Sequence, residues 1–266
     1  MKYFLLWIPL LILQLQANTF TLTIEGTGDS QELLRGLAKV YEVEHQDMII
    51  NIPNSIGSSG GIKKVIENKL VLARVARKLK YKEKKEGVKY LLFAYSPVVF
   101  VVNANNKKNY NISSSDILKI FKGDIESWEN IKGVDLSGKI YVVNRELGDS
   151  SLSILQKNFY GFDKIEKFTG IIANYNSEAI NLITKYKNTI GYLSLANTMN
   201  TSLNILSIDG ISPSMENIKT SKYKYLTPFG FAYKGELTKE SKKFLKFLNS
   251  KSAKEYMISH GVIPSK

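Results

Sequence analysis

Short apolar runs alternate with amphipathic stretches along most of the chain. Residues 20–26 (FTLTIEG) alternate apolar and polar side chains and stop at a glycine, as a half-buried strand does. Residues 31–45 have their apolar positions at helical spacing, and one face of the expected helix collects Leu33, Leu34, Leu37, Ala38 and Tyr41. A strand followed directly by an amphipathic helix is typical of α/β proteins.

The same two patterns predict the later elements. Further strands are expected at 47–54, 90–103, 138–145, 189–195 and 225–235, and the segment 70–79 should contain a short buried strand. Further helices are expected at 61–70, 116–124, 151–161, 177–187, 239–250 and 252–261. The order of these segments predicts an α/β fold, and the sequence shows neither an internal repeat nor a low-complexity tract.

The first 17 residues have the layout of a secretory signal peptide. Lys2 precedes an apolar run from Tyr3 to Leu13, and a polar stretch then leads to Ala17, after which we expect cleavage. The apolar run is too short to span a bilayer comfortably. The sequence therefore predicts an exported, periplasmic protein, and retention of the leader as a membrane anchor is the alternative.

Composition narrows the range of functions. The 266 residues suffice for one large or two modest domains, and 44% of them are hydrophobic, as in globular proteins. The absence of cysteine excludes disulfides, thiolate metal sites, thiol nucleophiles and a lipoprotein anchor. The formal net charge of +13 comes mostly from scattered lysines, which we interpret as a solvated surface. No interleaving of basic and aromatic residues indicates nucleic-acid binding.

Three loops rich in glycine, serine and aspartate each stand between a predicted strand and a predicted helix. They are 26–30 (GTGDS), 57–61 (GSSGG) and 145–151 (RELGDSS). A helix N-terminus presents unpaired N–H donors and about half a positive charge, and small residues let these donors approach a ligand. Three such loops around one point would bind a small tetrahedral anion, with Arg145 adding a bidentate charged contact. Ordinary helix capping is the alternative for any one loop.

These motifs resemble those of the periplasmic phosphate-binding proteins of ATP-binding-cassette (ABC) importers, which have the type II periplasmic binding protein fold. The resemblance covers nearly all of the chain after the leader, and it also includes NTIGYLSLA at 188–196 and the ending TPFGFAYKG…GVIP. It implies an α/β protein of two lobes, each a mixed sheet flanked by helices, joined by two crossover strands. Residues 18–95 and 197–266 would form the first lobe, and 96–196 the second.

The resemblance also implies a function and a set of ligand contacts. The protein would capture inorganic phosphate between its lobes for the permease subunits of an ABC importer, as a monomer without cofactor, metal or enzymatic activity. Arg77 is kept in register as a second cation facing the ligand. The other residues at the family's phosphate-contacting positions are Ser30, Gln31, Ser58, Arg145, Asp149, Ser150 and Ser151.

One segment departs from the family pattern. The strand that usually carries a carboxylate and a Ser-Arg or Ser-Asp pair reads LVLARVARKL at 70–79, with Val71 near the carboxylate position and Ala76 at that of the serine. Hydrogen phosphate must donate its proton to an acceptor, whereas sulfate has no proton, so a buried carboxylate selects phosphate. We expect Asp149, which replaces a serine, to be this acceptor. Asp29 is the other candidate, and a plain N-cap is the alternative role of Asp149.

Three other functions stay open on the sequence alone. They are binding or sensing of another oxyanion such as sulfate, an enzyme acting on phosphate esters, and an interaction protein that kept the fold but lost the pocket through the changes at 70–79. The sequence argues against an enzyme, because His45 and His260 lie in different predicted helices and no metal-binding or nucleophile motif is present. We expect both histidines to be surface or capping residues.

Overall fold

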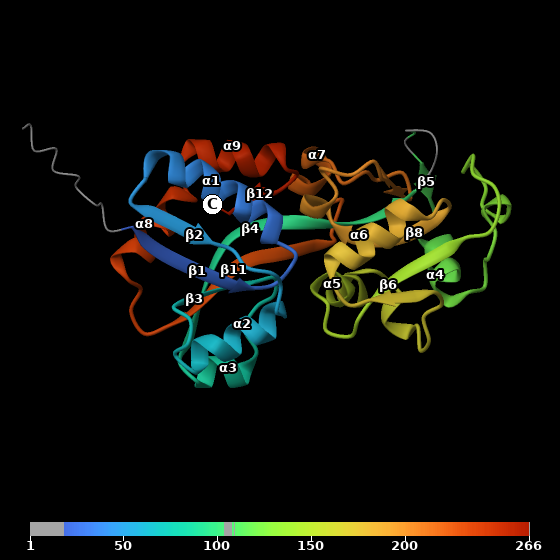
Figure 1. The fold of residues 1–266 in the computed structure, drawn as a ribbon. Coiled ribbons are helices and arrows are strands. Elements are labelled where there is room, and N and C mark those ends of the chain that lie inside the picture. The colour runs from blue at the N-terminus through green and yellow to red at the C-terminus, as the bar shows by residue number, and fades with distance from the viewer. Residues whose placement is uncertain (1–18, 104–107, 109, 266) are drawn as a thin grey trace, which may run out of the picture.

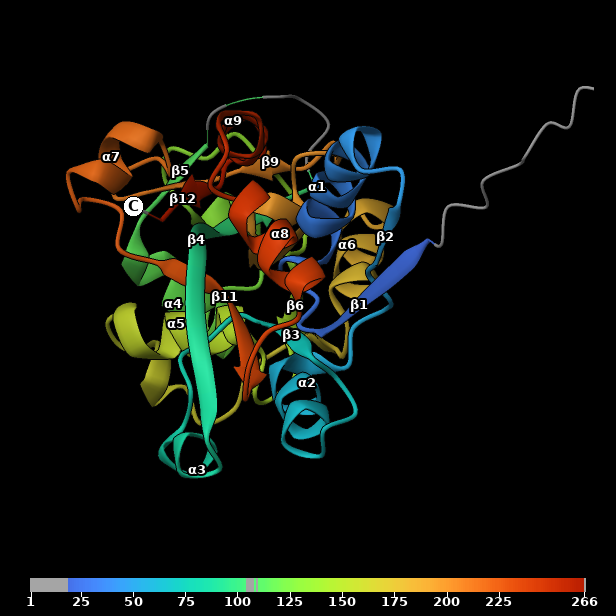
Figure 2. The same cartoon turned by 90° about the vertical axis from the view of Figure 1, so that its left-hand side faces the viewer.

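The computed structural model describes residues 19–103, 108 and 110–265, and it shows a mixed sheet divided between two lobes (Figures 1 and 2). The predicted signal peptide, 1–17, lies outside the described residues. The strands are β1 (Phe20–Gly26), β2 (Met48–Asn51), β3 (Leu72–Val75), β4 (Val88–Val102), β5 (Asn111–Ile112), β6 (Tyr141–Arg145), β7 (Ile171–Ala173), β8 (Thr189–Ser194), β9 (Asn204–Ile205), β10 (Ser207–Ile208), β11 (Leu226–Lys234) and β12 (Ile263–Pro264).

The order of the strands explains how one sheet serves both lobes. It runs β2-β1-β3-β11-β4-β8-β6-β7, with β9 and β12 also paired to β4, while β5 and β10 form a separate pair. β1 is parallel to β2 and β3, and β6 is parallel to β7 and β8. β4 is antiparallel to β11 in the first lobe and to β8 in the second. The sheet of each lobe is therefore mixed, as predicted.

Helices cover both faces of the sheet in each lobe. In the first lobe α1, α8 and α9 pack on one face and α2 on the other, and in the second lobe α4 and α5 lie opposite α6. Among the described residues no helix has both the length and the apolar character needed to cross a membrane. The helices are α1 (Gln31–Glu44), α2 (Gly57–Ile66), α3 (Tyr81–Lys85), α4 (Ser114–Lys122), α5 (Ser150–Asn158), α6 (Asn176–Lys185), α7 (Met215–Lys219), α8 (Lys239–Phe247) and α9 (Lys251–Ser259).

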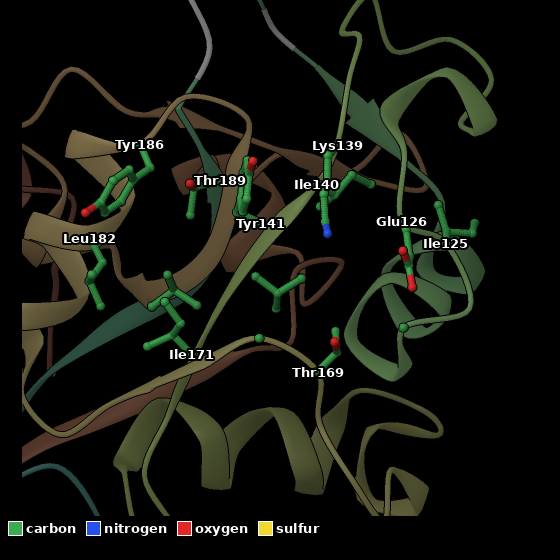
Figure 3. Close-up of a pocket in the computed structure, with 14 residues that line it drawn as sticks. Ile125, Glu126, Lys139, Ile140, Tyr141, Thr169, Ile171, Leu182, Tyr186 and Thr189 are labelled. Atoms are coloured by element: carbon green, nitrogen blue, oxygen red, sulfur yellow. The ribbon is translucent and has the colours of Figure 1, made fainter.

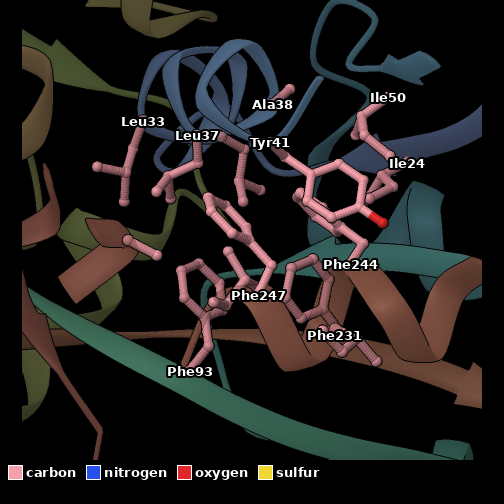
Figure 4. Packing of buried hydrophobic residues seen from close by; sticks show 14 of the residues in the cluster. Ile24, Leu33, Leu37, Ala38, Tyr41, Ile50, Phe93, Phe231, Phe244 and Phe247 are labelled. Carbon is pink, nitrogen blue, oxygen red and sulfur yellow. The ribbon is translucent and has the colours of Figure 1, made fainter. Parts of the chain in front are cut away.

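The long strand β4 contributes to a separate hydrophobic core in each lobe. Its residue Phe93 lies in the first core, beside Phe231 of β11 and below α1 (Figure 4). Further along the same strand, Phe100 lies in the second core and contacts the ring of Phe121 edge-on. Each buried side chain of this size contributes about 1.5–3 kcal/mol, so β4 helps to stabilise the core of both lobes. The predicted two-lobed α/β fold is confirmed.

The return of the chain to the first lobe differs from the expected boundary at 196/197. After β8, Ala196 does join the first core. The chain then comes back to the second lobe, because β9 pairs with the end of β4. Leu206, directly after β9, and Tyr223 both lie in the second core. It enters the first lobe for the last time through β11. The segment 204–223, expected in the first lobe, thus packs with the second.

Candidate functional site

Residues from all three small-residue segments line one cavity of about 340 Å³ between the lobes. The second segment, 57–61, is not a loop as predicted, because α2 already begins at Gly57 and includes it. The first lobe contributes 27–29 and 55–58 to its lining, and the second contributes residues of 145–150 and 174–176. Helices α1, α2, α5 and α6 begin within two residues of this lining. Their N-termini favour a negative charge. The sequence predicted small-residue segments at the starts of α1, α2 and α5, whereas it did not indicate that the start of α6 belongs to the same site.

Arg145, the last residue of β6, is buried at this cavity with only 6% of its surface exposed. Its Nε donates to the carbonyl oxygen of Ala173 at 3.2 Å and its Nη1 to Oδ1 of Asn176, while Nη2 lies 3.2 Å from Oδ2 of Asp149. A guanidinium has five N–H groups. The contacts with described residues therefore leave a donor on each terminal nitrogen, and such a pair suits bidentate binding of an oxyanion.

Asp149 already has partners for both carboxylate oxygens. Oδ1 accepts a hydrogen bond of 2.9 Å from the backbone N–H of Leu152, so Asp149 is the N-cap of α5. Oδ2 forms the ion pair with Arg145. The structure thus gives Asp149 the capping role that the sequence analysis named as the alternative. The expected role as acceptor of the phosphate proton fits another carboxylate better.

That carboxylate is Asp29, which is 98% buried between β1 and α1, since only 2% of its surface is exposed. Its Oδ1 accepts a hydrogen bond of 2.8 Å from Nδ2 of Asn176, and its Oδ2 has no hydrogen-bond partner among the described residues. The pKa of Asp29 is raised to about 6, mainly by burial and to a smaller extent by the negative charge of Asp149. Asn176, Arg145 and Ser150 lower this pKa but do not cancel the rise. Asp29 therefore has a free oxygen that can accept a proton from a ligand.

The raised pKa of Asp29 predicts a specific dependence of stability on pH. The folded state keeps the proton up to about pH 6, whereas the unfolded chain loses it near 3.8, so the folded state binds more protons between these values. The free energy of unfolding contributed by Asp29 therefore falls as the pH rises through this window. We expect Asp29→Asn to remove that fall.

Urea unfolding of the wild type and of Asp29→Asn at a series of pH values checks this expectation. The stability of the variant relative to the wild type should increase from about pH 4 to pH 6 and stay level above pH 7. A difference between the two proteins that does not change with pH would contradict the raised pKa of Asp29.

Of the serines and the glutamine predicted at the site, some line the cavity and the others lie outside its lining. Ser58 and Ser150 line it, and the Oγ of Ser58 accepts a hydrogen bond of 3.0 Å from the N–H of Ala76. Ser30 and Ser151 are buried outside this lining, and their hydroxyls have no hydrogen-bond partner in the described part of the chain. Gln31 also lies outside the lining, and its Oε1 accepts from Arg74 at 3.1 Å.

Arg77 does not line the cavity, which corrects its expected role. Its guanidinium forms a bidentate ion pair with Glu83, with N–O distances of 2.7 and 2.9 Å, and it donates to the Oγ of Ser59 at 3.0 Å. Glu83 neutralises this cation away from the anion cavity, so the register of Arg77 alone does not make it a ligand contact.

Arg74, near the end of β3, stabilises the first loop by hydrogen bonds from its guanidinium. It is fully buried, and burial is the main reason why its pKa is lowered to about 10, which leaves it charged at neutral pH. The neighbouring position 26 requires glycine, because a Cβ there would lie 1.9 Å from the carbonyl oxygen of Arg74 and the backbone φ is +141°. The guanidinium donates to the carbonyl oxygens of Ile24, Thr27 and Pro53 and to the side chain of Gln31.

A larger cavity of about 420 Å³ in the second lobe has a different chemistry (Figure 3). Its lining is mostly apolar, with Ile140, Ile171 and Leu182 among its residues and with Lys139 and Glu126 as the charged ones. An apolar lining does not compensate a dehydrated dianion. The interlobe cavity is therefore the candidate anion site.

The described residues do not suggest a metal centre or a nucleophile at this site. No group of three or more His, Asp or Glu side chains in the described part of the chain is arranged to hold a metal ion. His45 and His260 are the C-caps of α1 and α9, as expected from the sequence, and neither lines the cavity. The arrangement offers one guanidinium, helix N-termini and an acceptor carboxylate, which together suit a protonated tetrahedral oxyanion.

Comparison with known proteins adds independent information. Residues 14–252 match the family model described as "PBP superfamily domain". The phosphate-binding protein PstS of Bacillus subtilis (strain 168) is 29% identical over 92% of this chain and 80% of its own length. PstS of Borreliella burgdorferi is 31% identical over 63% of this chain and 62% of its own length.

Among solved structures, a proposed phosphate ABC transporter substrate-binding protein from Clostridium perfringens, with bound phosphate, has a TM-score of 0.80. It is 27% identical in sequence, and the match covers 93% of this chain and all of that chain.

Proposed function

The chain belongs to the PBP superfamily, and from this premise we propose that it captures inorganic phosphate between its lobes and delivers it to the permease subunits of an ABC importer. The similar proteins from B. subtilis and B. burgdorferi are named as phosphate-binding proteins, and the C. perfringens structure contains phosphate. In such a protein, ligand stabilises the closed arrangement of the lobes through a hinge motion.

The observation that carries this proposal is the buried guanidinium of Arg145 at a cavity beside four helix N-termini. A buried cation with free donors and a set of backbone N–H groups replace the hydration of a tetraoxo anion. Asp29, with its free Oδ2, accepts the proton that hydrogen phosphate carries. The intact cavity argues against an interaction protein with a degraded site, although the segment 70–79 departs from the family pattern.

We further propose that the protein acts by binding alone and that it does so outside the cytoplasmic membrane. The names of the similar proteins describe binding and not catalysis. The leader at 1–17, with its single lysine and short apolar run, supports export with cleavage after Ala17. Five further residues stay proposed ligand contacts, which would bind the anion through backbone N–H or hydroxyl groups: Ser30, Gln31, Ser58, Ser150 and Ser151.

A thermal-shift series tests the proposed function. Phosphate at 100 times its dissociation constant should stabilise the protein by about 2.7 kcal/mol. We expect a comparable effect of arsenate, which has the same shape and also carries a proton, and smaller effects of sulfate, molybdate and methylphosphonate. Potassium chloride at equal ionic strength serves as the control. No stabilisation by phosphate would refute the proposal, and release of phosphate from p-nitrophenyl phosphate by the pure protein would refute the non-enzymatic role.

A further inference from the structure

Asn176 stands between two cavities in the cleft. One is the anion cavity, and the other is a larger cavity of about 630 Å³ whose lining includes Gln31, Arg35 and Asn54. Four residues line both cavities, so they form the wall that separates them: Gly28, Ser55, Tyr175 and Asn176.

The amide of Asn176 completes this wall by contacts that cross the cleft. Its Nδ2 donates at 2.8 Å to Oδ1 of Asp29 in the first lobe, and its Oδ1 accepts from Nη1 of Arg145 in the second. Asn176 therefore touches Asp29 and Arg145, two of the charged residues that line the anion cavity, at once. Since neither amide atom is free to turn without losing a hydrogen bond to a buried charge, the side chain is held in one orientation.

Gly28 makes room for this contact. A Cβ at Gly28 would lie 3.2 Å from Nδ2 of Asn176 and 3.3 Å from the Oγ of Ser55, which is tighter than ordinary van der Waals contact. The absence of a side chain at Gly28 thus lets the amide of Asn176 close against the backbone of the first loop. The wall is built jointly by the two lobes, and it exists only when they are close together.

We infer that Asn176 is a specificity-determining residue, which closes the anion cavity against phosphate esters by separating it from the larger cavity. The inference rests on the proposed binding of phosphate. A phosphomonoester has the same phosphoryl oxygens plus one that carries an organic group, and this group needs space beyond the anion cavity. The larger cavity has the volume and the polar lining for a small polyol group, but Asn176 belongs to the wall that separates it from the anion cavity.

Calorimetric titration of the full chain with phosphate and with glycerol 3-phosphate tests the inference. The wild type should prefer phosphate, and Asn176→Ala should lower the ratio of the two affinities by about tenfold or more, because a steric barrier to the ester is removed. The ratio is the relevant quantity, since loss of the contacts to Arg145 and Asp29 also weakens phosphate itself. Asn176→Ser, which keeps a small hydrogen-bonding group, provides a second variant should the alanine variant fold poorly.

Asn54→Ala is the matched control, because Asn54 is an exposed asparagine that lines the larger cavity but not the anion cavity and so is not part of the wall. Its affinity ratio should equal that of the wild type. A wild type that binds phosphate, together with Asn176 variants that keep its preference, would overturn the inference while leaving the proposed function intact. Loss of both ligands in both variants would also overturn it, since Asn176 would then only support phosphate binding. A wild type that does not bind phosphate would refute the proposed function itself.

Discussion

Replacing Arg145 with alanine is expected to weaken phosphate binding by roughly 100-fold or more, because each charge-assisted hydrogen bond contributes about 1.5–3 kcal/mol and the guanidinium has two donors to offer. The side chain is buried and is oriented by Ala173, Asn176 and Asp149 before any ligand arrives. Little entropy is therefore lost when it binds the anion. Calorimetric titration with phosphate measures the change in affinity.

Arg77→Ala is the matched control for this prediction. Arg77 is also an arginine in an ion pair near the small-residue loops, but its partner is Glu83 and it does not line the cavity. Its removal should leave the affinity for phosphate within a factor of about two, because its charge is already paired with Glu83 and it does not line the cavity. Thermal unfolding of both variants without ligand separates loss of binding from loss of folding. Equal affinities of Arg145→Ala and the wild type would refute the assignment of the site.

The second large effect is expected on the choice between phosphate and sulfate. Asp29→Asn should raise the affinity for sulfate relative to phosphate by about tenfold or more, because the variant no longer places an uncompensated like charge next to the anion. The amide still offers an oxygen to the proton of phosphate. Competition of sulfate against bound phosphate at pH 8, where Asp29 is ionised, measures the change.

Asp149→Asn distinguishes the two carboxylates. Asp149 caps α5 and pairs with Arg145, so its replacement should lower stability and weaken both anions alike, without changing their ratio. If Asp149→Asn changed the ratio and Asp29→Asn did not, then the role first expected for Asp149 from the sequence would be correct. Equal competition by sulfate in the wild type would show that no carboxylate of the protein discriminates.

The local elements and the three loops were predictable because their determinants lie close together in the sequence. The spacing of Leu33, Leu37 and Tyr41 is enough to define the buried face of α1, and all three are buried in the first core. The small residues at the start of α2 and before and within the first turn of α5 indicate helix starts by their backbone and capping chemistry alone. Arg145 stands out for the same reason, as a single cation next to a small-residue turn.

The sequence named Asp149 and Asp29 as candidate acceptors but could not choose between them, because each role depends on the partner that the fold provides. Arg77 would be a free cation if Glu83 were elsewhere, and Asp149 would be a free acceptor without the N–H of Leu152 and the charge of Arg145. The burial of Asp29 and its unpartnered oxygen favour it over Asp149 as the acceptor.

Local patterns in the sequence were thus enough to indicate the α/β class, a helix start at each of the three small-residue segments, and Arg145 as the candidate cation of the proposed anion site, although α2 begins four residues earlier than expected. Packing between distant segments sets which lobe receives 204–223, which carboxylate keeps a free oxygen, and that Asn176 reaches Asp29 across the cleft from 147 positions away. The physical reason is that periodicity and capping are properties of neighbouring residues. Burial, charge pairing and contact between lobes arise only when distant segments pack together.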